Sequence, residues 1–327
     1  MRILVVGAGA IGGYFGGRLM QAGRDVTFLV RPRRASELAA TGLVIKSPAG
    51  DVTLRAPPTV LAGKLRDPFD LVLLSVKAYD LDDAVASFAP AVGPTTAILP
   101  LLNGMRHLDV LDVRFGRDRV LGGRCLIAAT LDEDHAILHL GKDHELSFGE
   151  RDGTSSDRIR AISAAMAGAA FDAHASGQIL QDMWEKWVFL AALAGSTCLM
   201  RAAVGDIVAS PGGKDIVLGL LAECRAVAEA NGFPPRDAFI ERSRGMLTAP
   251  GSTFTASMLR DIERQAPIEA DHILGDLIGR GKRTDSAPSE MSLLRVAFAN
   301  LKAYEARRNR TLSETHAASR AENPQRS

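Results

Sequence analysis

MRILVVGAGAIGGY (residues 1–14) opens the chain and decides its fold. Residues 2–6 form a short apolar run rich in β-branched side chains, which is typical of a buried strand. Gly7, Gly9 and Gly12 follow in the spacing G-x-G-x-x-G, and apolar residues then recur at helical intervals. A strand, a glycine turn and a helix in this order are the context in which the motif indicates a dinucleotide site.

The three glycines have different physical tasks in such a turn. Gly7 permits the tight turn, Gly9 leaves room for a pyrophosphate beside the backbone, and Gly12 lets the helix pack close to the strand. The free N–H groups and the dipole of the helix start then face an anion. The alternative is a glycine-rich turn that binds nothing. The residues expected to contact the pyrophosphate are Gly7, Ala8, Gly9, Ala10, Ile11 and Gly12.

The residues after the second predicted strand, 25–30, decide between NAD and NADP. An acidic residue there would accept hydrogen bonds from a ribose 2′-hydroxyl. This chain instead has Arg31-Pro32-Arg33-Arg34, and guanidinium groups suit a 2′-phosphate. We expect NADP, with Arg31 as the main contact and Arg33 or Arg34 assisting. The alternative is a solvated basic helix start.

Composition limits the class of protein. The length of 327 residues suggests two domains, and 46% hydrophobic with 24% charged residues is a globular composition. A net charge of +1 gives no electrostatic reason to expect a nucleic acid or an anionic membrane as partner. Three widely spaced cysteines argue against a disulfide framework or a metal site. Without a signal-peptide or membrane-span pattern, we expect a cytoplasmic protein.

Strand patterns dominate the chain up to about residue 176. Residues 44–47 and 52–54 flank a turn and predict a hairpin, and 135–140 with 145–148 predict another around Gly141-Lys142-Asp143. A helix is predicted at 155–166. Further strands are predicted at 70–77, 95–99, 120–130 and 170–173. We therefore expect an α/β domain over residues 1–176, with a parallel sheet.

Helical patterns replace strands after residue 177. They predict an all-helical domain over residues 177–308. Its apolar helices could serve a homodimer interface as easily as a core, so both alternatives stay open. Residues 309–327 are polar without an apolar stripe, so a disordered tail is expected. The predicted helices are 178–200, 213–231, 236–247, 253–264, 267–281 and 287–308.

Several polar residues stand where ligands gather in such a fold. Lys77 ends one predicted sheet strand, and Asn103 follows the next. Lys186 projects from an apolar face of the helix 178–200, where a lysine is costly unless it is paired or functional. An ion pair with Asp182 is the structural alternative. Glu269 lies near a helix start, where complementing the helix dipole is the alternative role.

At these residues the sequence resembles the ketopantoate reductase (2-dehydropantoate 2-reductase) family, over nearly the whole chain to about residue 308. The family belongs to a wider group whose helical domain is like that of 6-phosphogluconate dehydrogenase. The motifs that carry the resemblance are the glycine turn, Val76-Lys77-Ala78, Asn103-Gly104-Met105, Trp184-x-Lys186, Ser257-Met258-Leu259-x-Asp261 and Glu269-x-Asp271. The resemblance implies a Rossmann-type doubly wound sheet followed by the helical domain. It also implies NADPH-dependent reduction of 2-dehydropantoate to pantoate in coenzyme A biosynthesis.

The resemblance also assigns roles to single residues. Lys186 would be the general acid, Asn103 would contact substrate and nicotinamide, and Ser257 would bind the substrate carboxylate. Cofactor contacts are implied for Arg31, at the 2′-phosphate, and for Lys77, Ala129 and Glu269. No metal ligand is implied.

Two departures from the family pattern concern the substrate. The family has asparagines four and eight residues after the lysine, and this chain has Leu190 and Ala194 there, on the Lys186 face. A wall that would hydrogen-bond the substrate has become apolar, and such a loss can change specificity by orders of magnitude. A related dehydrogenase for a bulkier, more apolar 2-oxo acid is therefore an alternative. A non-catalytic NADP-binding regulator is another, although the joint presence of Lys186, Ser257 and Glu269 argues against it.

Overall fold

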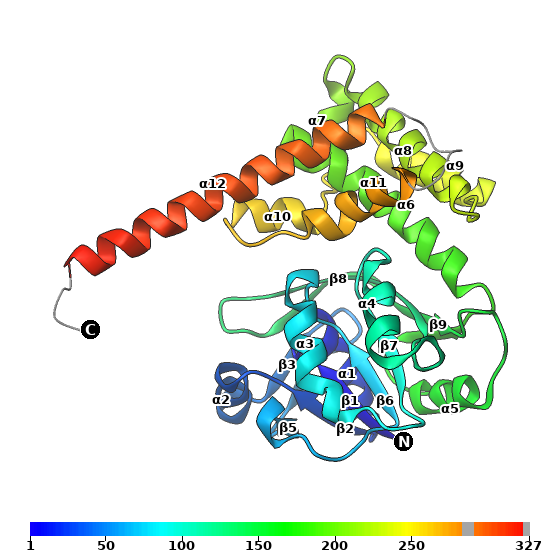
Figure 1. Ribbon diagram of the computed structural model, residues 1–327, viewed down its shortest axis with the longest axis vertical. Coiled ribbons are helices and arrows are strands. Elements are labelled where there is room, and N and C mark those ends of the chain that lie inside the picture. The colour runs from blue at the N-terminus through cyan, green and yellow to red at the C-terminus, as the bar shows by residue number, and fades with distance from the viewer. Residues whose placement is uncertain (283–290, 323–327) are drawn as a thin grey trace. The chain divides into compact units, whose positions relative to one another are not determined.

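The computed structural model describes residues 1–282 and 291–322 of the chain, which divides into two compact units, Met1–Met183 and Trp184–Ser327 (Figure 1). The division falls later than the boundary at residue 176 that the sequence predicts. The reason is that the first turn of helix α6 (Ile179–Met200) packs against strands of the N-terminal unit. A Cβ atom on Gly122 would lie 2.6 Å from Ile179 Cγ2.

The first sheet of the N-terminal unit has the strand order β5-β2-β1-β6-β7, and every neighbouring pair is parallel. The central strand β1 is buried from Ile3 to Val6, as a parallel sheet covered on both faces requires. The predicted α/β fold with a parallel sheet is confirmed. The strands are β1 (Arg2–Val6), β2 (Asp25–Leu29), β5 (Thr59–Val60), β6 (Leu71–Leu74) and β7 (Ala97–Pro100).

The second sheet has the order β10-β9-β3-β4, and β8 pairs with β9. The antiparallel pair β3–β4 confirms the first predicted hairpin. The second predicted hairpin is wrong, because β9 runs as one strand through Gly141-Lys142-Asp143. Residues 140–143 lie opposite the single residue Ala128. These residues, whose types are common in turns, therefore form a β-bulge in the strand. The strands are β3 (Leu43–Lys46), β4 (Val52–Leu54), β8 (Gly122–Leu131), β9 (Ile137–Gly149) and β10 (Asp172–Ala175).

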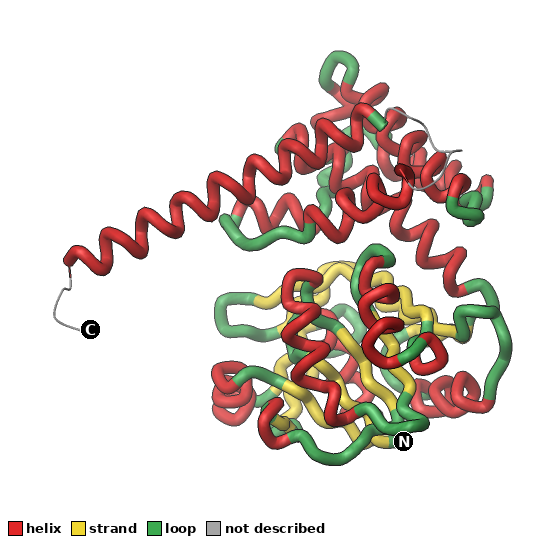
Figure 2. Tube along the Cα trace, in the orientation of Figure 1, coloured by secondary structure: helices red, strands yellow, loops and turns green. Residues whose placement is uncertain are grey.

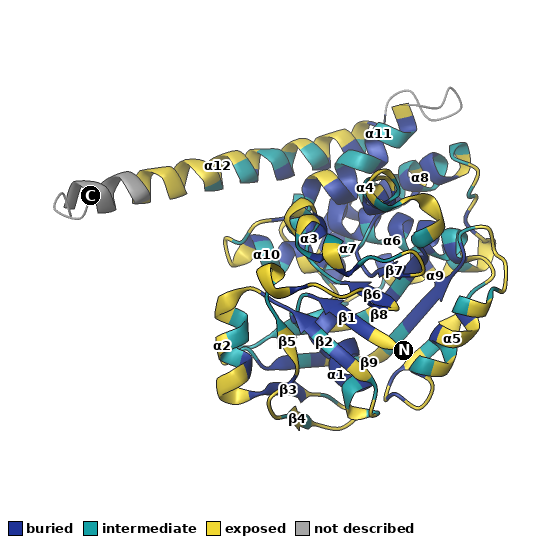
Figure 3. Cartoon of the chain, turned by 60° about the horizontal axis from the view of Figure 1, so that its bottom comes forward, coloured by how far each residue is buried: buried dark blue, intermediate teal, exposed yellow. Residues whose placement is uncertain are grey.

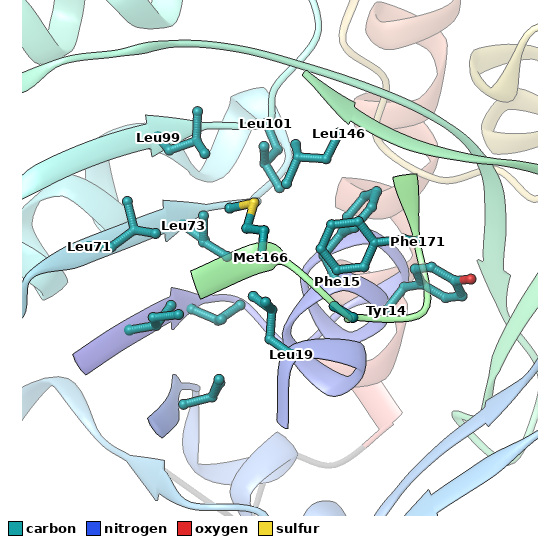
Figure 4. Packing of buried hydrophobic residues seen from close by; sticks show 14 of the residues in the cluster. Tyr14, Phe15, Leu19, Leu71, Leu73, Leu99, Leu101, Leu146, Met166 and Phe171 are labelled. Carbon is teal, nitrogen blue, oxygen red and sulfur yellow. The ribbon is translucent and has the colours of Figure 1, made fainter. Parts of the chain in front are cut away.

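Helix α1 (Ala10–Gln21) contacts strands of both sheets. A Cβ atom on Gly16 would come within 3 Å of side chains of β1 and β2, and one on Gly17 would come as close to β3. The helix therefore approaches both sheets more closely than larger residues would allow. Its Tyr14, Phe15 and Leu19 are fully buried and belong to one hydrophobic cluster with leucines of β6 and β7 (Figure 4). One core thus includes both sheets.

Four further helices complete the N-terminal unit (Figure 2). The helix predicted at 155–166 is confirmed as α5, which begins after Ser156; the Ser156 hydroxyl accepts a hydrogen bond from the Ile159 N–H. The four helices are α2 (Pro32–Thr41), α3 (Leu81–Phe88), α4 (Arg106–Phe115) and α5 (Asp157–Met166).

The C-terminal unit is built from helices in the part of it that the structure describes. Helix α8 contacts α7, α9, α11 and α12, and α6 is buried along most of its length from Trp187 onward (Figure 3). The predicted helical domain is confirmed; α7 was not predicted, and residues 287–290 of the last predicted helix lie outside the described residues. The helices after α6 are α7 (Val204–Ala209), α8 (Gly213–Ala230), α9 (Asp237–Leu247), α10 (Ser257–Glu263), the π-helical turn η5 (Asp271–Gly275), α11 (Asp276–Lys282) and α12 (Ser292–Glu322).

Helix α12 continues through residues 309–322, where the sequence predicts a disordered tail. Its buried stripe, Leu294, Ala297, Leu301 and Tyr304, ends before that stretch, and residues 309–315 are exposed. A helix that is already nucleated can extend into polar sequence, because each added residue gains a backbone hydrogen bond without a new nucleation step. Residues 323–327 lie outside the described part.

Among the described residues, no helix has both the length and the apolar composition needed to cross a membrane. In the same ranges, no three His, Cys, Asp or Glu side chains gather so that they could hold a metal ion.

Candidate functional site

The glycine turn after β1 has the close contacts that its residue types require. Gly7 has a φ of +94°, which favours glycine, and its N–H donates to Leu29 O at 3.0 Å. A Cβ atom on Gly12 would lie 2.0 Å from Ser75 Oγ and 2.2 Å from Gly7 O. The Ser75 hydroxyl reaches Val6 O at 3.1 Å and Gly7 O at 3.2 Å. The end of β6 therefore holds the turn in place, and Gly12 has no room for a side chain.

Gly9 differs from the other two glycines because its missing side chain faces open space. A Cβ atom there would meet nothing within 4 Å. Gly9 is the residue before α1, and no side chain caps that helix start. The N–H groups of the first turn are therefore offered to an anion that approaches the backbone over Gly9. The turn fits a pyrophosphate in charge, in donors and in space.

Three arginines follow β2 at the start of α2, and each has a carboxylate partner. Arg31, which follows β2, donates to Asp80 Oδ1 at 2.6 Å and remains 68% exposed at its side chain. Arg33 pairs with Glu37 at 2.8 Å. Arg34 is more buried, contacts the same Glu37 and donates from Nε to Ala8 O at 3.1 Å. Of the guanidinium groups predicted to bind a 2′-phosphate, that of Arg34 contacts the glycine turn directly, and Arg31 and Arg33 stand at the start of the same helix, α2.

The strand-end residues lie on neighbouring strands of the first sheet. Lys77 follows β6, and Asn103 follows β7; both side chains are partly exposed. Gly104, after Asn103, has a φ of +77°, so the turn that presents the amide needs glycine. Ala129 lies on β8 of the second sheet, beside the bulge and opposite His139. Lys77 and Asn103 share one sheet edge with the glycine turn, and Ala129 does not.

In the C-terminal unit, α6 carries Lys186 and Leu190 on a partly exposed stripe, and Ala194 is buried further along the helix. The residues on either side of Lys186 fix the helix. Glu185 accepts hydrogen bonds from Arg236 Nε at 2.7 Å and from its backbone N–H at 2.9 Å. Trp187 is fully buried. The backbone that carries Lys186 is thus held on both sides.

Helix α6 also contacts the segments of the other two predicted residues. Trp187 Nε1 donates to Ile273 O at 2.9 Å, in the π-helical turn that follows Glu269. Phe189 stacks on Phe254 with ring centroids 6.1 Å apart, three positions before Ser257. Lys186, the Ser257 segment and the Glu269 turn are therefore tied to one helix. Ser257 is exposed and Glu269 partly exposed.

Sequence reasoning missed three contacts at the N-terminal site. Ser75 holds the glycine turn, Arg34 contacts the carbonyl of Ala8, and Asp80 pairs with Arg31. These contacts follow from the strand order of the structure: β2 and β6 both flank β1, so residues that follow them meet at one edge.

Comparisons with known proteins cover both units. The family described as "Ketopantoate reductase PanE/ApbA" matches residues 3–153, and its "C terminal" counterpart matches residues 178–305. An "Uncharacterized oxidoreductase YkpB" of Bacillus subtilis is 40% identical over 94% of this chain and 99% of its own. A 2-dehydropantoate 2-reductase of Mesorhizobium japonicum is 28% identical over 87% of this chain and 93% of its own. The crystal structure of a 2-dehydropantoate 2-reductase from Geobacter metallireducens is 29% identical, with a TM-score of 0.84 over 93% of this chain and 99% of that one.

Proposed function

Because the chain belongs to the ketopantoate reductase family of oxidoreductases acting on CH–OH groups, we propose that it reduces a 2-oxo acid to the 2-hydroxy acid with NADPH. The substrate we propose first is 2-dehydropantoate, which gives pantoate and thus a place in pantothenate and coenzyme A biosynthesis. The observation that carries the proposal is the arrangement around α6. A lysine on the partly exposed stripe of a buried helix has the segments of Ser257 and Glu269 tied to the same helix.

The roles of the residues follow from their chemistry. A reduced nicotinamide, when bound, supplies the hydride. Lys186 Nζ would donate the proton to the carbonyl oxygen as negative charge develops there. The Asn103 amide would orient the carbonyl, and the Ser257 hydroxyl would hydrogen-bond the carboxylate of the acid. Lys77, Ala129 and Glu269 would contact the nicotinamide nucleotide, and the glycine turn would take its pyrophosphate.

NADPH is proposed over NADH because three arginines follow β2 and the guanidinium of Arg34 contacts the glycine turn. Arg31 is the proposed main contact, since it follows β2 directly and its side chain is exposed. Steady-state kinetics with each nucleotide test this. We expect a lower KM for NADPH; an equal or lower KM for NADH would contradict the choice of cofactor.

A second substrate class is favoured by the side chains next to Lys186. Leu190 is partly exposed one turn after Lys186, and the stacked rings of Phe189 and Phe254 lie next to that stripe. These groups offer apolar contact and no hydrogen bond, so a 2-oxo acid with a bulky apolar side chain fits them better than a hydroxylated one.

A panel of 2-oxo acids, followed by NADPH absorbance, separates the two substrate classes. Preference for 2-dehydropantoate supports the first proposal and rejects the second. Preference for an acid with a bulky apolar side chain that carries no hydroxyl group does the reverse. If no acid is turned over while NADPH still binds tightly, the protein is a nucleotide-binding regulator and the enzymatic proposal fails.

We further propose that the protein acts in the cytoplasm on small molecules alone, with neither a nucleic acid nor a membrane as partner. The near-zero net charge gives no long-range attraction to either polyanion. Light scattering on the purified protein distinguishes a monomer from a homodimer formed through the apolar helices of the C-terminal unit.

A further inference from the structure

The ion pair of Arg31 and Asp80 lies at the edge of the first sheet where the adenosine ribose is expected. Arg31 follows β2, and Asp80 follows β6 at the start of α3. These two strands flank β1 on opposite sides, so the pair joins the strand ends on either side of the glycine turn. The donor–acceptor distance from Arg31 Nη2 to Asp80 Oδ1 is 2.6 Å.

The pair is accessible from solvent. The side chain of Arg31 is 68% exposed and that of Asp80 is 30% exposed. A ligand can therefore reach either partner without a change in the core. Exposed pairs of this kind contribute about 0.2–1 kcal/mol, so a ligand with comparable chemistry can displace one partner from the other.

The two partners favour different nucleotides. A guanidinium donates to a phosphate, often with two parallel hydrogen bonds. A carboxylate accepts from a ribose 2′-hydroxyl and repels a phosphate dianion. The pKa of Arg31 is raised, first by its hydrogen bond to Asp80 and then by the charge of that carboxylate. The neighbouring Arg33 and Arg34 are both paired with Glu37, so their charge is partly compensated as well.

We propose that Asp80 sets the preference between the phosphorylated and the unphosphorylated nicotinamide nucleotide. It competes with a 2′-phosphate for Arg31, and it accepts the free 2′-hydroxyl when no phosphate is present. NADPH then binds less tightly than three nearby arginines alone would allow, and NADH is not excluded. This inference rests on the proposed dinucleotide site, and it does not depend on which 2-oxo acid is reduced.

Binding of two cofactor fragments to the intact protein tests the proposal. Adenosine 2′,5′-bisphosphate and adenosine 5′-monophosphate are titrated by calorimetry into the unmodified protein and into Asp80→Asn. We expect the Kd of the bisphosphate to fall by about three- to tenfold in the variant, because a competing charge is removed. The Kd of the monophosphate should rise by about two- to fivefold, because a charged acceptor is lost.

Asp82→Asn is the matched control, since it removes the same charge two residues further along, at an exposed position. Neither Kd should change by more than about twofold there, because exposed charges that make no direct contact are screened. Asp80→Asn should fold normally, because the Asp80 side chain does not cap α3 by a hydrogen bond. Thermal unfolding of each variant checks this.

Two outcomes overturn the inference while leaving the proposed function intact. One is an unchanged ratio of the two Kd values in Asp80→Asn, and the other is an equal shift of that ratio in Asp82→Asn. Failure of the unmodified protein to bind either fragment would refute the dinucleotide site and the inference together. Binding needs no turnover, so inactivity on every 2-oxo acid would contradict only the reaction.

Discussion

Lys186 is the residue on which the proposed chemistry depends most. It lies on the partly exposed stripe of α6, between two buried neighbours, Glu185 and Trp187. Both neighbours hydrogen-bond to other segments of the helical unit, so the lysine backbone cannot shift without breaking them. Such a fixed position is what a proton donor needs, because transfer requires hydrogen-bond distance to the acceptor.

Lys186→Ala should lower kcat by about 10²- to 10⁴-fold, the usual contribution of a positioned general acid. The Kd of NADPH should stay nearly unchanged, because the nucleotide contacts proposed here belong to other residues. Stopped-flow kinetics and fluorescence titration measure the two quantities. The control is Lys214→Ala, an exposed lysine on α8. Normal turnover in Lys186→Ala would remove this residue from the mechanism.

Gly9 and Gly12 allow the binding and the folding role of the glycine turn to be separated. Gly9→Ala adds a methyl group into open space, whereas Gly12→Ala places one against Ser75 and the Gly7 carbonyl. We expect Gly9→Ala to keep its Tm and to lose most NADPH affinity. Gly12→Ala should lose several degrees of Tm as well, since an overpacked contact costs about 1–3 kcal/mol. A Gly9→Ala variant that binds NADPH normally would show that the cofactor does not approach there.

At the level of residues, local requirements were predictable and distant contacts were not. The positive φ of Gly7 and the crowding at Gly12 follow from the motif itself. The contacts of Ser75 and Asp80 depend on which strand ends lie next to each other, and that order is absent from any local pattern. The catalytic and binding roles of Lys186, Ser257 and Glu269 remain predictions.

Among the elements, α6 shows how one helix can organise a site. Its Glu185 is 5% exposed at the side chain and receives two hydrogen bonds from the Arg236 guanidinium and one from the Arg236 backbone. Arg236, the residue before α9, is thereby fixed to the helix that carries Lys186. A buried carboxylate is costly without such donors.

Arg236→Ala should lower the free energy of unfolding by about 2 kcal/mol, because it removes the guanidinium and leaves Glu185 buried with the backbone donor. Chemical denaturation measures the change. Arg225→Ala, which breaks an exposed pair with Glu229 on α8, should cost less than about 1 kcal/mol. Equal losses in the two variants would mean that burial of Glu185 adds nothing.

Elements with long periodic patterns were predicted well, and short or ambiguous ones were not. The predicted helix at 178–200 matches α6, whereas α7, only six residues long, was missed. Gly141-Lys142-Asp143 was interpreted as a turn because those residue types suit turns. In β9 they lie in a bulge, where the same residue types are tolerated.

For the molecule as a whole, acid stability should depend on Glu150. Its carboxylate accepts two hydrogen bonds from Arg158, at 2.7 and 2.6 Å, and one from Ser156. These bonds, those from Arg158 first, hold the pKa of Glu150 below its ordinary value. The folded protein therefore binds this proton less readily than the unfolded chain. The stabilisation is present above the unfolded pKa and is lost as the pH falls through the lower folded pKa.

Glu150→Gln should therefore lower the Tm at pH 7, and the difference from the unmodified protein should shrink as the pH falls from about 5 to 3. Thermal unfolding at a series of pH values measures this. Glu229→Gln, in an exposed pair, serves as control and should show little difference at any pH. A Tm difference for Glu150→Gln that does not shrink at all over this range would mean that the side chain acts by packing and not by charge.

The overall architecture followed from the sequence because a change from strand to helical patterns near residue 177 is strong over many residues. The end of the chain did not follow in the same way. Helix α12 continues beyond its buried stripe because an existing helix can propagate into polar sequence. The pattern of apolar residues in the sequence does not indicate this extension.

The position of α1 between two sheets has a consequence for synthesis on the ribosome. The helix is made within the first 21 residues, but β8 and β9, which cover part of it, end only at Leu131 and Gly149. Until those strands emerge, the nascent chain exposes the apolar surface of an element that is already complete. We expect this interval to be the period when the growing polypeptide depends most on a chaperone.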